Sequence, residues 1–167
     1  AHNENDQAET VLFHLFRGSG IKGLTGIAPV RGQIVRPLLC VNRKEIEHYL
    51  STRGFHYQID RTNLTEQYAR NKIRNRVLPY VLKEINKKAV EHVVQAASIL
   101  SETEKYIEKN VIFAFEQIVS EHNGQYSFLV DAFFQEDIVI QKRIIRKIIE
   151  KLIYKLKNIE ADHVSLI

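Results

Sequence analysis

Three side chains that could do chemistry stand at the beginning of the sequence, in the stretch AHNENDQAETVLFHLFRGSG: His2, Asp6 and Glu9. With about 100° of rotation per residue, a helix places these three on one side. Apolar residues at i, i+3 and i+4 spacing form a separate stripe, roughly 115° away: Ala8, Val11, Leu12, Leu15 and Phe16. The stretch therefore predicts a helix that buries one face and carries two acids and an imidazole at its entrance.

Two interpretations of this group are open. Two carboxylates held ionised at a helix start could bind Mg²⁺ or an ammonium group, with His2 as a proton carrier or hydrogen-bond donor. The alternative is an ordinary polar helix start, because the helix dipole stabilises acids in the first turn and a cap by Asn3 or Asn5 is routine. Spacing alone favours the ordinary start.

A second candidate group is the basic run RNKIRNR. Arg70 and Arg74 are four residues apart and share one helix face, and Lys72 and Arg76 share another. Such pairs repel by roughly a few tenths of a kcal/mol each. Phosphate would compensate the charge, because a guanidinium group binds it at two points. The alternative is a solvated helix face balanced by acids elsewhere.

A third feature is the glycine-rich stretch RGSGIKGLTGI, with four glycines between Gly18 and Gly26. Such a density favours sharp turns or the close approach of a ligand. Its GSGIKG portion matches the letters of a dinucleotide-binding fingerprint. However, that fingerprint follows a strand and opens a helix, whereas this stretch follows a predicted helix, so we reject the nucleotide interpretation.

Local signals place the elements that must position these groups. The first helix is predicted from Asp6 to Arg17, ending before Gly18. The stretch GQIVRPLLCV predicts a short strand, with Pro37 at an edge or an end. The stretch FHYQIDRTN predicts an extended segment that closes in a turn.

A second helix is predicted after Asn42, because Glu45 completes a capping-box pattern, and it ends by Gly54. Its inward side chains are expected to be Ile46, Tyr49 and Leu50. Helical periodicity returns from Glu66, and Pro79 should kink this helix or start a new one.

The remaining sequence predicts mostly helix. Residues 87–120 form one long or two shorter amphipathic helices. Asn123 and Gly124 predict a turn before a possible strand, QYSFLV, and Asp131 could cap the next helix. A wide apolar face marks a further helix over residues 143–156: Ile144, Ile145, Ile148, Ile149, Leu152, Ile153 and Leu156.

Composition indicates a soluble globular protein, with 167 residues, 44% hydrophobic and 26% charged. No apolar run is long enough to span a membrane, and no export leader is visible. The single Cys40 excludes an internal disulfide and a thiolate metal cluster, so a reducing cytoplasm is expected.

Charge divides the chain. Residues 1–83 hold 13 Lys and Arg against 7 Asp and Glu, and residues 84–167 hold 11 against 13. The basic first half suggests contact with a polyanion, although a modest positive charge also serves solubility. The sequence begins at Ala1 and has no Met. We therefore expect an excised piece of a longer protein, the alternative being that modified methionines are left out of the sequence.

In this order, the motifs closely resemble one family, the bacterial tRNA(Ile)-lysidine synthetases. The matching stretches are HNENDQAET, RGSGIKGLTGI, IVRPLL, DRTN and YARNKIRNRVLP, within about residues 2–79. The family usually has two consecutive Asp residues where this sequence has Asn5 and Asp6.

The resemblance implies a mainly α fold. Residues 1–83 would be the C-terminal remnant of a Rossmann-like α/β ATP-pyrophosphatase domain. An all-helical, tRNA-contacting domain would follow over residues 84–167. The glycine- and serine-rich loop with which the family holds ATP phosphates is not found here, so the resemblance implies that this chain alone is inactive.

The resemblance also implies a reaction for the whole enzyme. ATP, with Mg²⁺, adenylates the C2 oxygen of the wobble cytidine in a tRNA(Ile) precursor with a CAU anticodon, and pyrophosphate is released. The side-chain amine of L-lysine then attacks C2, and AMP leaves. Relatives suggest a homodimer, and no membrane partner is expected.

Roles for individual residues follow from the resemblance. Asp6 and Glu9 would bind lysine or a metal ion, with Asp6 as the possible metal ligand and His2 as a supporting polar group. Arg74, Arg70 and, more weakly, Arg36 would contact ATP phosphates or the tRNA backbone: these residues complete the candidate site. We expect the two acids and the arginine-bearing segment to share one cleft.

Two other function classes remain open. Another tRNA-modifying ATP pyrophosphatase, such as a thiolase, is less favoured, because thiolation normally needs reactive cysteines and Cys40 is isolated. A non-catalytic helical RNA-binding module would bind tRNA in a salt-sensitive way, without dependence on Asp6 or Glu9.

Overall fold

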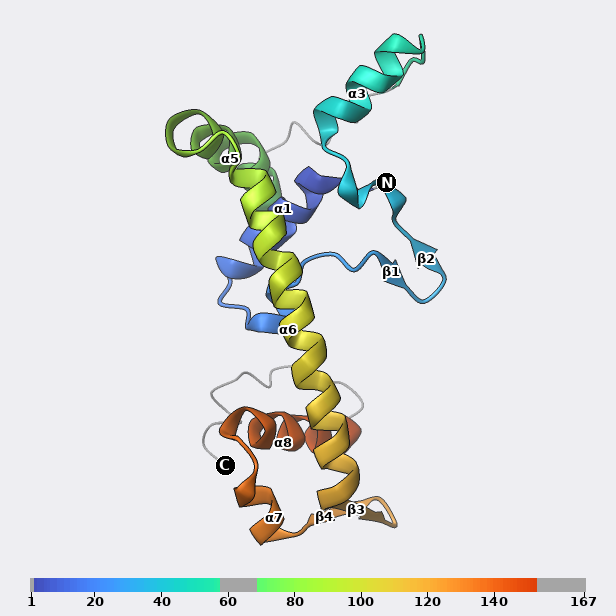
Figure 1. Cartoon of the computed structure of the whole chain (residues 1–167), viewed down its shortest axis with the longest axis vertical. Helices are drawn as coiled ribbons and strands as arrows, with labels where there is room; N and C mark the ends of the chain where they lie inside the picture. Colours follow the sequence, from blue (N-terminus) through green and yellow to red (C-terminus); the bar gives the residue numbers. More distant parts are fainter. Residues whose placement is uncertain (1, 58–68, 153–167) are drawn as a thin grey trace. The chain divides into compact units, whose positions relative to one another are not determined.

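The computed structural model describes residues 2–57 and 69–152 of the chain. The described part is mainly α-helical, and its strands form two short antiparallel hairpins (Figure 1). The chain divides into two compact units, Ala1–Glu104 and Lys105–Ile167. Among the described residues, no helix combines the length and the apolar character needed to cross a lipid bilayer.

The first unit contains short elements around one longer helix. They are α1 (Glu4–Leu15), α2 (Ile21–Leu24), β1 (Val30–Arg31), β2 (Ile34–Val35), η1 (Pro37–Cys40), α3 (Arg43–Thr52), α4 (Ala69–Lys72), η3 (Ile73–Val77), α5 (Leu78–Tyr80), η4 (Val81–Ile85) and the first part of α6 (Ala89–Ile118). The second unit contains the rest of α6, β3 (Val119–His122), β4 (Gln125–Phe128), α7 (Val130–Gln135) and α8 (Ile138–Leu152).

Helix α1 begins with a capping box. The Asp6 N–H donates to Asn3 Oδ1 at 3.0 Å, and the Asn3 N–H donates to Asp6 Oδ2 at 3.0 Å. Asn3 is therefore the cap, one of the two asparagines predicted, and the helix starts at Glu4 rather than Asp6. The helix stops at Leu15 because the chain turns through Gly18, whose φ is +72°.

The glycine-rich stretch packs directly on α1. The Ile27 N–H donates to Gln7 Oε1 at 2.6 Å, and His14 Nδ1–H donates to the Gly23 carbonyl oxygen at 2.6 Å. Gly26 has a φ of +72°, and a Cβ there would lie 2.7 Å from Gln7 Oε1. Glycine at this position therefore serves a close contact between this segment and α1.

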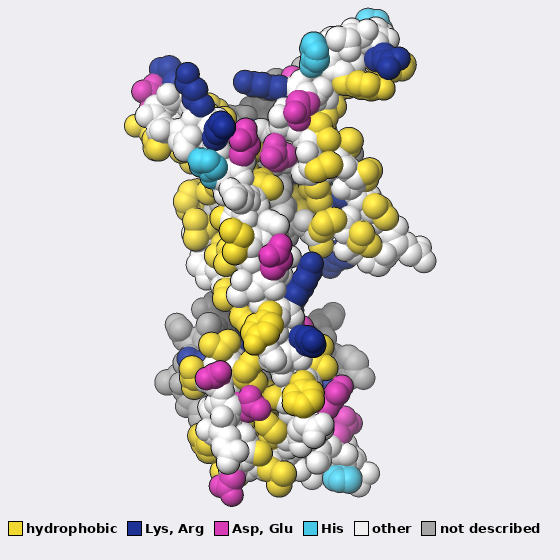
Figure 2. All heavy atoms as spheres, in the orientation of Figure 1, with side chains coloured by type: hydrophobic (Ala, Val, Ile, Leu, Met, Phe, Trp, Pro, Cys, Tyr) yellow, Lys and Arg dark blue, Asp and Glu magenta, His cyan; other side chains and the backbone are white. Residues whose placement is uncertain are grey.

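Pro37 shortens the predicted strand. Only Ile34 and Val35 pair with β1, and Pro37 opens the 3₁₀ turn η1 because it has no N–H to donate to a ladder. The hairpin of β1 and β2 exposes hydrophobic side chains at the surface (Figure 2): Val30, Ile34 and Val35.

Helix α3 has the predicted capping box between Asn42 and Glu45. The prediction that Tyr49 faces inward is wrong, since this side chain is 57% exposed, and no residue of α3 is fully buried. The physical reason is that α3 packs little against the other described elements, although its first residue is attached to α1 through Asn5. Most of the predicted extended segment FHYQIDRTN lies outside the described residues.

Residues 69–85 form consecutive helical turns in which π turns flank Pro79. The Leu78 N–H reaches the carbonyl oxygen of Ile73, five residues back, and the Asn86 N–H reaches that of Val81. Because Pro79 lacks an N–H, the wider turns replace the regular ladder there instead of ending the helix.

The core of the first unit joins α1 to these turns and to the start of α6. Its buried residues are Ala8, Ile73, Leu78 and Val90. Val93 and Val94 pack against the same core, so the compact unit extends beyond residue 83. The division into functional domains at 83/84 stays a prediction.

The second unit contains a predicted hairpin. Asn123 and Gly124 have φ values of +51° and +76°, and the turn they form joins β3 to β4. The expectation of an all-helical second domain is therefore wrong. Asp131 does not cap α7, because Leu129 stands at the cap position and Asp131 lies in the first turn.

Residues 87–120 form one helix rather than two across most of their length, namely α6. Ile144, Ile145 and Ile148 of the predicted apolar face pack in the core of the second unit, whereas Leu152 is exposed. That core consists of Val111, Ala114, Ile118, Phe133, Ile140, Ile144 and Ile148. Ile153 and Leu156 lie outside the described residues.

Candidate active site

A small open pocket lies at the start of α1, with a volume of about 190 Å³. Three elements of the first unit form it: the start of α1, the first residue of α3 and the turns around Pro79. The lining residues are Asn3, Asn5, Asp6, Glu9, Arg43, Arg74, Leu78, Pro79 and Leu82. One wall is therefore polar and charged, and another is apolar.

Arg74 is the centre of the charged wall. Its Nε–H donates to Glu9 Oε1 at 2.6 Å, and its Nη2 donates to Glu9 Oε2 at 2.8 Å and to Asp6 Oδ1 at 2.6 Å. A guanidinium group bonded at two points to one carboxylate and at a third to another is fixed in orientation. Asp6 and Glu9 can both meet it because they are three residues apart on α1.

Arg70 supports the same group from one helical turn earlier. Its Nε–H donates to Glu9 Oε2 at 3.4 Å, and its Nη2 donates to the backbone oxygen of Asp6 at 3.2 Å. The Arg70 side chain is 39% exposed, against 23% for Arg74, so Arg70 is the more accessible of the two.

The two carboxylates, Asp6 and Glu9, are balanced in charge by the two arginines, Arg70 and Arg74. Glu9 is only 2% exposed, and burial of a carboxylate is unfavourable unless a cation and hydrogen bonds compensate it. Arg74 and Arg70 supply that compensation. In return, the hydrogen bonds that Arg74 donates to Glu9 raise the pKa of Arg74, burial opposes this, and the charges of Glu9 and Asp6 add to the increase. The two carboxylates are thus held as fixed acceptors on one wall of the pocket.

Another part of the pocket lining is held by a contact that the sequence did not predict. Asn5 Oδ1 accepts the backbone N–H of Arg43 at 2.9 Å, which attaches the first turn of α3 to α1. The Arg43 side chain then lines the pocket. The capping-box signal at Asn42 placed the start of α3, but no sequence signal placed that start beside α1.

His2 and Arg36 form a separate contact. The Arg36 Nε–H donates to His2 Nδ1 at 3.3 Å, and Arg36 Nη1 donates to the backbone oxygen of Ala28 at 3.0 Å. Neither residue lines the pocket. The structure therefore brings together four of the predicted site residues, Asp6, Glu9, Arg70 and Arg74, and it places the other two, His2 and Arg36, beside each other.

The described residues fit a divalent cation poorly. Among them, no three His, Cys, Asp or Glu side chains are grouped closely enough to hold a metal ion. Asp6 also uses one oxygen in the helix cap and the other with Arg74. The predicted role of Asp6 as a metal ligand therefore gains no geometric support here.

Comparison with known proteins places the chain in a family. Residues 1–81 match the PP-loop domain. The chain is 39% identical over 165 residues to the "tRNA(Ile)-lysidine synthase" of Caldanaerobacter subterraneus subsp. tengcongensis, covering 99% of the chain and 35% of that protein. Proteins with the same name from Clostridium perfringens and Clostridioides difficile are 37% and 36% identical over 99% and 98% of the chain.

The chain thus spans about a third of the length of the relatives it matches, 35% and 36% of the two clostridial proteins. Residues 1–81 carry the PP-loop match, and the similarity continues through the helical remainder. On these grounds the chain belongs to the PP-loop family of ATP-binding domains and, across its length, to the family of the tRNA(Ile)-lysidine synthases.

Proposed function

We propose that this chain is part of an ATP-dependent ligase that attaches lysine to C2 of the wobble cytidine of tRNA(Ile). The observation that carries the proposal is an identity of 36–39% over nearly the whole chain to proteins named tRNA(Ile)-lysidine synthase. In the proposed reaction, ATP adenylates the C2 oxygen and pyrophosphate leaves. The lysine side-chain amine then forms the C2–N bond, and AMP leaves.

Asp6 and Glu9 are the proposed lysine-binding residues. Glu9 Oε2 already accepts two hydrogen bonds, whereas Glu9 Oε1 and both Asp6 oxygens accept one each, so a substrate ammonium group can join Arg74 as a further donor at these three oxygens. A carboxylate close to the attacking amine can also take up the proton that the amine loses. In this proposal, Arg74 fixes the orientation of Asp6 and Glu9. This role explains why an arginine lies beside the two carboxylates that would bind the substrate ammonium group.

The predicted contacts with phosphates remain part of the proposal. Arg70 is the better placed of the two clustered arginines to reach ATP or tRNA, because more of its side chain is exposed. His2 and Arg36 would support the same region as a pair. The PP-loop match supports the use of ATP. Mg²⁺ would enter with the nucleotide phosphates, which is common for this ion.

The remaining features of the proposal concern the whole protein. The substrate would be a tRNA(Ile) precursor with a CAU anticodon, the cosubstrate would be L-lysine, and the enzyme would act as a homodimer in the cytoplasm. The predicted second domain, residues 84–167, would contact the tRNA.

The test is incorporation of labelled lysine into a tRNA(Ile) transcript, measured with the complete protein in which this chain occurs. The unmodified protein should release AMP only when lysine is present. Asp6→Ala should reduce the rate by on the order of a hundredfold or more, since it removes a group that contacts the reacting substrate. Asp131→Ala, which changes an exposed acid on α7, is the matched control and should keep the rate.

Near-normal turnover of Asp6→Ala would refute the role given to that carboxylate. Transfer of sulfur in place of lysine would indicate a thiolase of the same superfamily. Salt-sensitive tRNA binding without any transfer, unchanged by Asp6→Ala, would indicate a non-catalytic RNA-binding module.

A further inference from the structure

The pocket has charges of opposite sign on two different elements. Asp6 and Glu9 on α1 form its acidic side, and Arg43 on α3 forms part of its rim. The apolar residues of the lining are Leu78, Pro79 and Leu82. Such a pocket matches a ligand with an ammonium group, an aliphatic stem and an oxyanion.

The backbone of Arg43 is held in place, whereas its side chain is bound only weakly. Its backbone N–H is bonded to Asn5 Oδ1 at 2.9 Å, which holds the residue beside α1 without using the side chain. In the described part of the chain, the guanidinium group has one ion pair, from Nε to Glu47 Oε1 at 2.8 Å, and 42% of the side chain is exposed. Exposed pairs of this kind contribute little stability, so an incoming oxyanion can replace Glu47 at small cost.

Arg74 cannot bind an incoming oxyanion at a similarly small cost. Its Nε and Nη2 groups donate to Glu9 and Asp6, and burying those acids depends on it. Arg43 is therefore the lining cation that can bind a ligand without exposing a buried charge.

We propose that Arg43 binds the α-carboxylate of the amino-acid substrate. This inference rests on the proposed function and adds to it the residue that distinguishes an amino acid from a simple amine. A guanidinium group binds a carboxylate at two points in one plane, which also orients the substrate. The aliphatic stem of lysine would then lie along the apolar wall, between Arg43 and the acids.

The size of the pocket favours an amino acid over a nucleotide. Its volume is about 190 Å³, whereas pockets for drug-sized ligands have about 300–1,000 Å³. A phosphate ligand for Arg43 is therefore the alternative outcome of the test.

The test compares ligands that differ only in the carboxylate. Binding of L-lysine, lysinamide and cadaverine to the complete protein is measured by calorimetry, with inorganic pyrophosphate as a fourth ligand. Lysinamide has no negative charge at this position, and cadaverine is lysine without its carboxylate. The unmodified protein should prefer lysine to both analogues by on the order of tenfold to a hundredfold.

Arg43→Gln should abolish this preference while leaving the affinities for lysinamide and cadaverine unchanged. Arg43→Lys should restore part of it, because an ammonium group keeps the charge but not the two-point geometry. Glu47→Gln should tighten lysine binding by roughly twofold to fivefold, because it removes the anion that competes for Arg43. A general loss of structure would weaken lysine binding, so it cannot explain tighter binding by Glu47→Gln.

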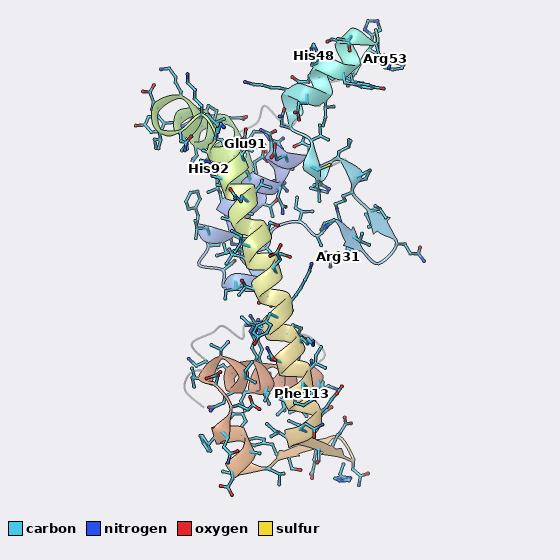
Figure 3. All side chains as sticks on the ribbon, viewed as in Figure 1. Arg31, His48, Arg53, Glu91, His92 and Phe113 are labelled. Carbon is cyan, nitrogen blue, oxygen red and sulfur yellow. The ribbon has the colours of Figure 1, made fainter. Side chains whose placement is uncertain are left out.

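Two other variants control for charge. Lys44→Gln removes an adjacent positive charge that does not line the pocket, and Arg53→Gln removes one at the far end of α3 (Figure 3). Both should keep the preference for lysine. In the steady state, Arg43→Gln should raise KM for lysine far more than it lowers kcat.

An unmodified protein that binds lysine and cadaverine equally would overturn the inference, and so would Arg43→Gln with its preference intact. Loss of pyrophosphate binding in Arg43→Gln, with lysine binding unaffected, would assign the residue to a phosphate instead. These results are distinct from failure of the proposed function, in which no lysine is transferred to tRNA by the unmodified protein.

Discussion

At the residue scale, the main feature is a buried carboxylate whose charge is compensated by an arginine 65 positions later in the chain. Glu9 and Arg74 share two short hydrogen bonds, and Asp6 adds a third to the same guanidinium group. Because each partner is costly to bury alone, the pair both fixes the contact between α1 and η3 and orients the acids toward the pocket.

Glu9→Gln should destabilise the protein by about 2–3 kcal/mol, because the half-buried Arg74 loses most of its compensating charge. The free energy of unfolding in urea measures this. Glu47→Gln makes the same chemical change in the exposed pair with Arg43, and it should cost less than about 1 kcal/mol. Equal losses of unfolding free energy in the two variants would show that the buried pair of Glu9 contributes no more stability than the exposed pair of Glu47.

A second prediction at this scale concerns Glu4. Its pKa is raised above 4.5 by burial, and then by the charges of Glu91 in the first turn of α6 (Figure 3) and of Glu45. The folded state therefore holds this proton more tightly than the unfolded state. Stability from this group falls as the pH rises from about 4.5 through the raised pKa.

Glu4→Gln removes this titration. The difference in Tm between the variant and the unmodified protein should therefore shift in favour of the variant as the pH is raised from about 4 to about 7. Thermal unfolding at several pH values measures the shift. A difference that stays constant, or that moves the other way, would contradict the prediction.

At the element scale, α1 organises the first unit because side chains on several of its faces hold different segments. Asn5 holds α3, Asp6 and Glu9 hold the turns that contain Arg74, and Gln7 holds the glycine-rich stretch. The pocket is the place where two of these attachments meet. Its geometry therefore depends on contacts of α1 rather than on any one loop.

Gly26→Ala should be strongly destabilising, by about 2 kcal/mol or more. The backbone there has a φ of +72°, and the new Cβ would lie 2.7 Å from Gln7 Oε1, which must move away from the Ile27 N–H. Gly32→Ala is the matched control, because its φ is +57° but nothing lies within 4 Å of the new Cβ. The control should show only the backbone cost, about 1–2 kcal/mol. Chemical denaturation distinguishes the two, and a similar loss in both would exclude a role for the Gln7 contact.

At the scale of the whole molecule, each compact unit has its own hydrophobic core. Ile73 is buried in the first core and Ile144 in the second. Separate cores predict separate local stabilities, because the burial of apolar surface within a unit is what holds that unit together.

Ile144→Ala should destabilise the second unit by about 2–5 kcal/mol, since Ile144 is fully buried. Amide hydrogen exchange should show the loss of protection mainly in residues 105–152. Ile73→Ala, of the same chemistry in the other core, should show it mainly before residue 105. Loss of protection over the whole chain in both variants would show that the two cores unfold as one.

The sequence by itself determined the features that depend on interactions between residues close together in the chain. The cap at Asn3 (one of two candidates), the capping box at Asn42 and the turn at Asn123 were predictable, because their hydrogen bonds join residues at most three positions apart. Helical spacing also placed Asp6 and Glu9 together on α1, and the motif resemblance indicated that they share a cleft with the arginine segment.

Only the tertiary structure decided how these local pieces meet. Tyr49 is exposed although its helical spacing is apolar, because packing partners rather than periodicity determine burial. The hydrogen bonds of Arg74 with Glu9 and of Arg43 with Asn5 join residues that are 65 and 38 positions apart in the sequence. No local pattern encodes such a pair, because its partners are chosen when separate elements bury their apolar faces and the charges left at the boundary must compensate one another.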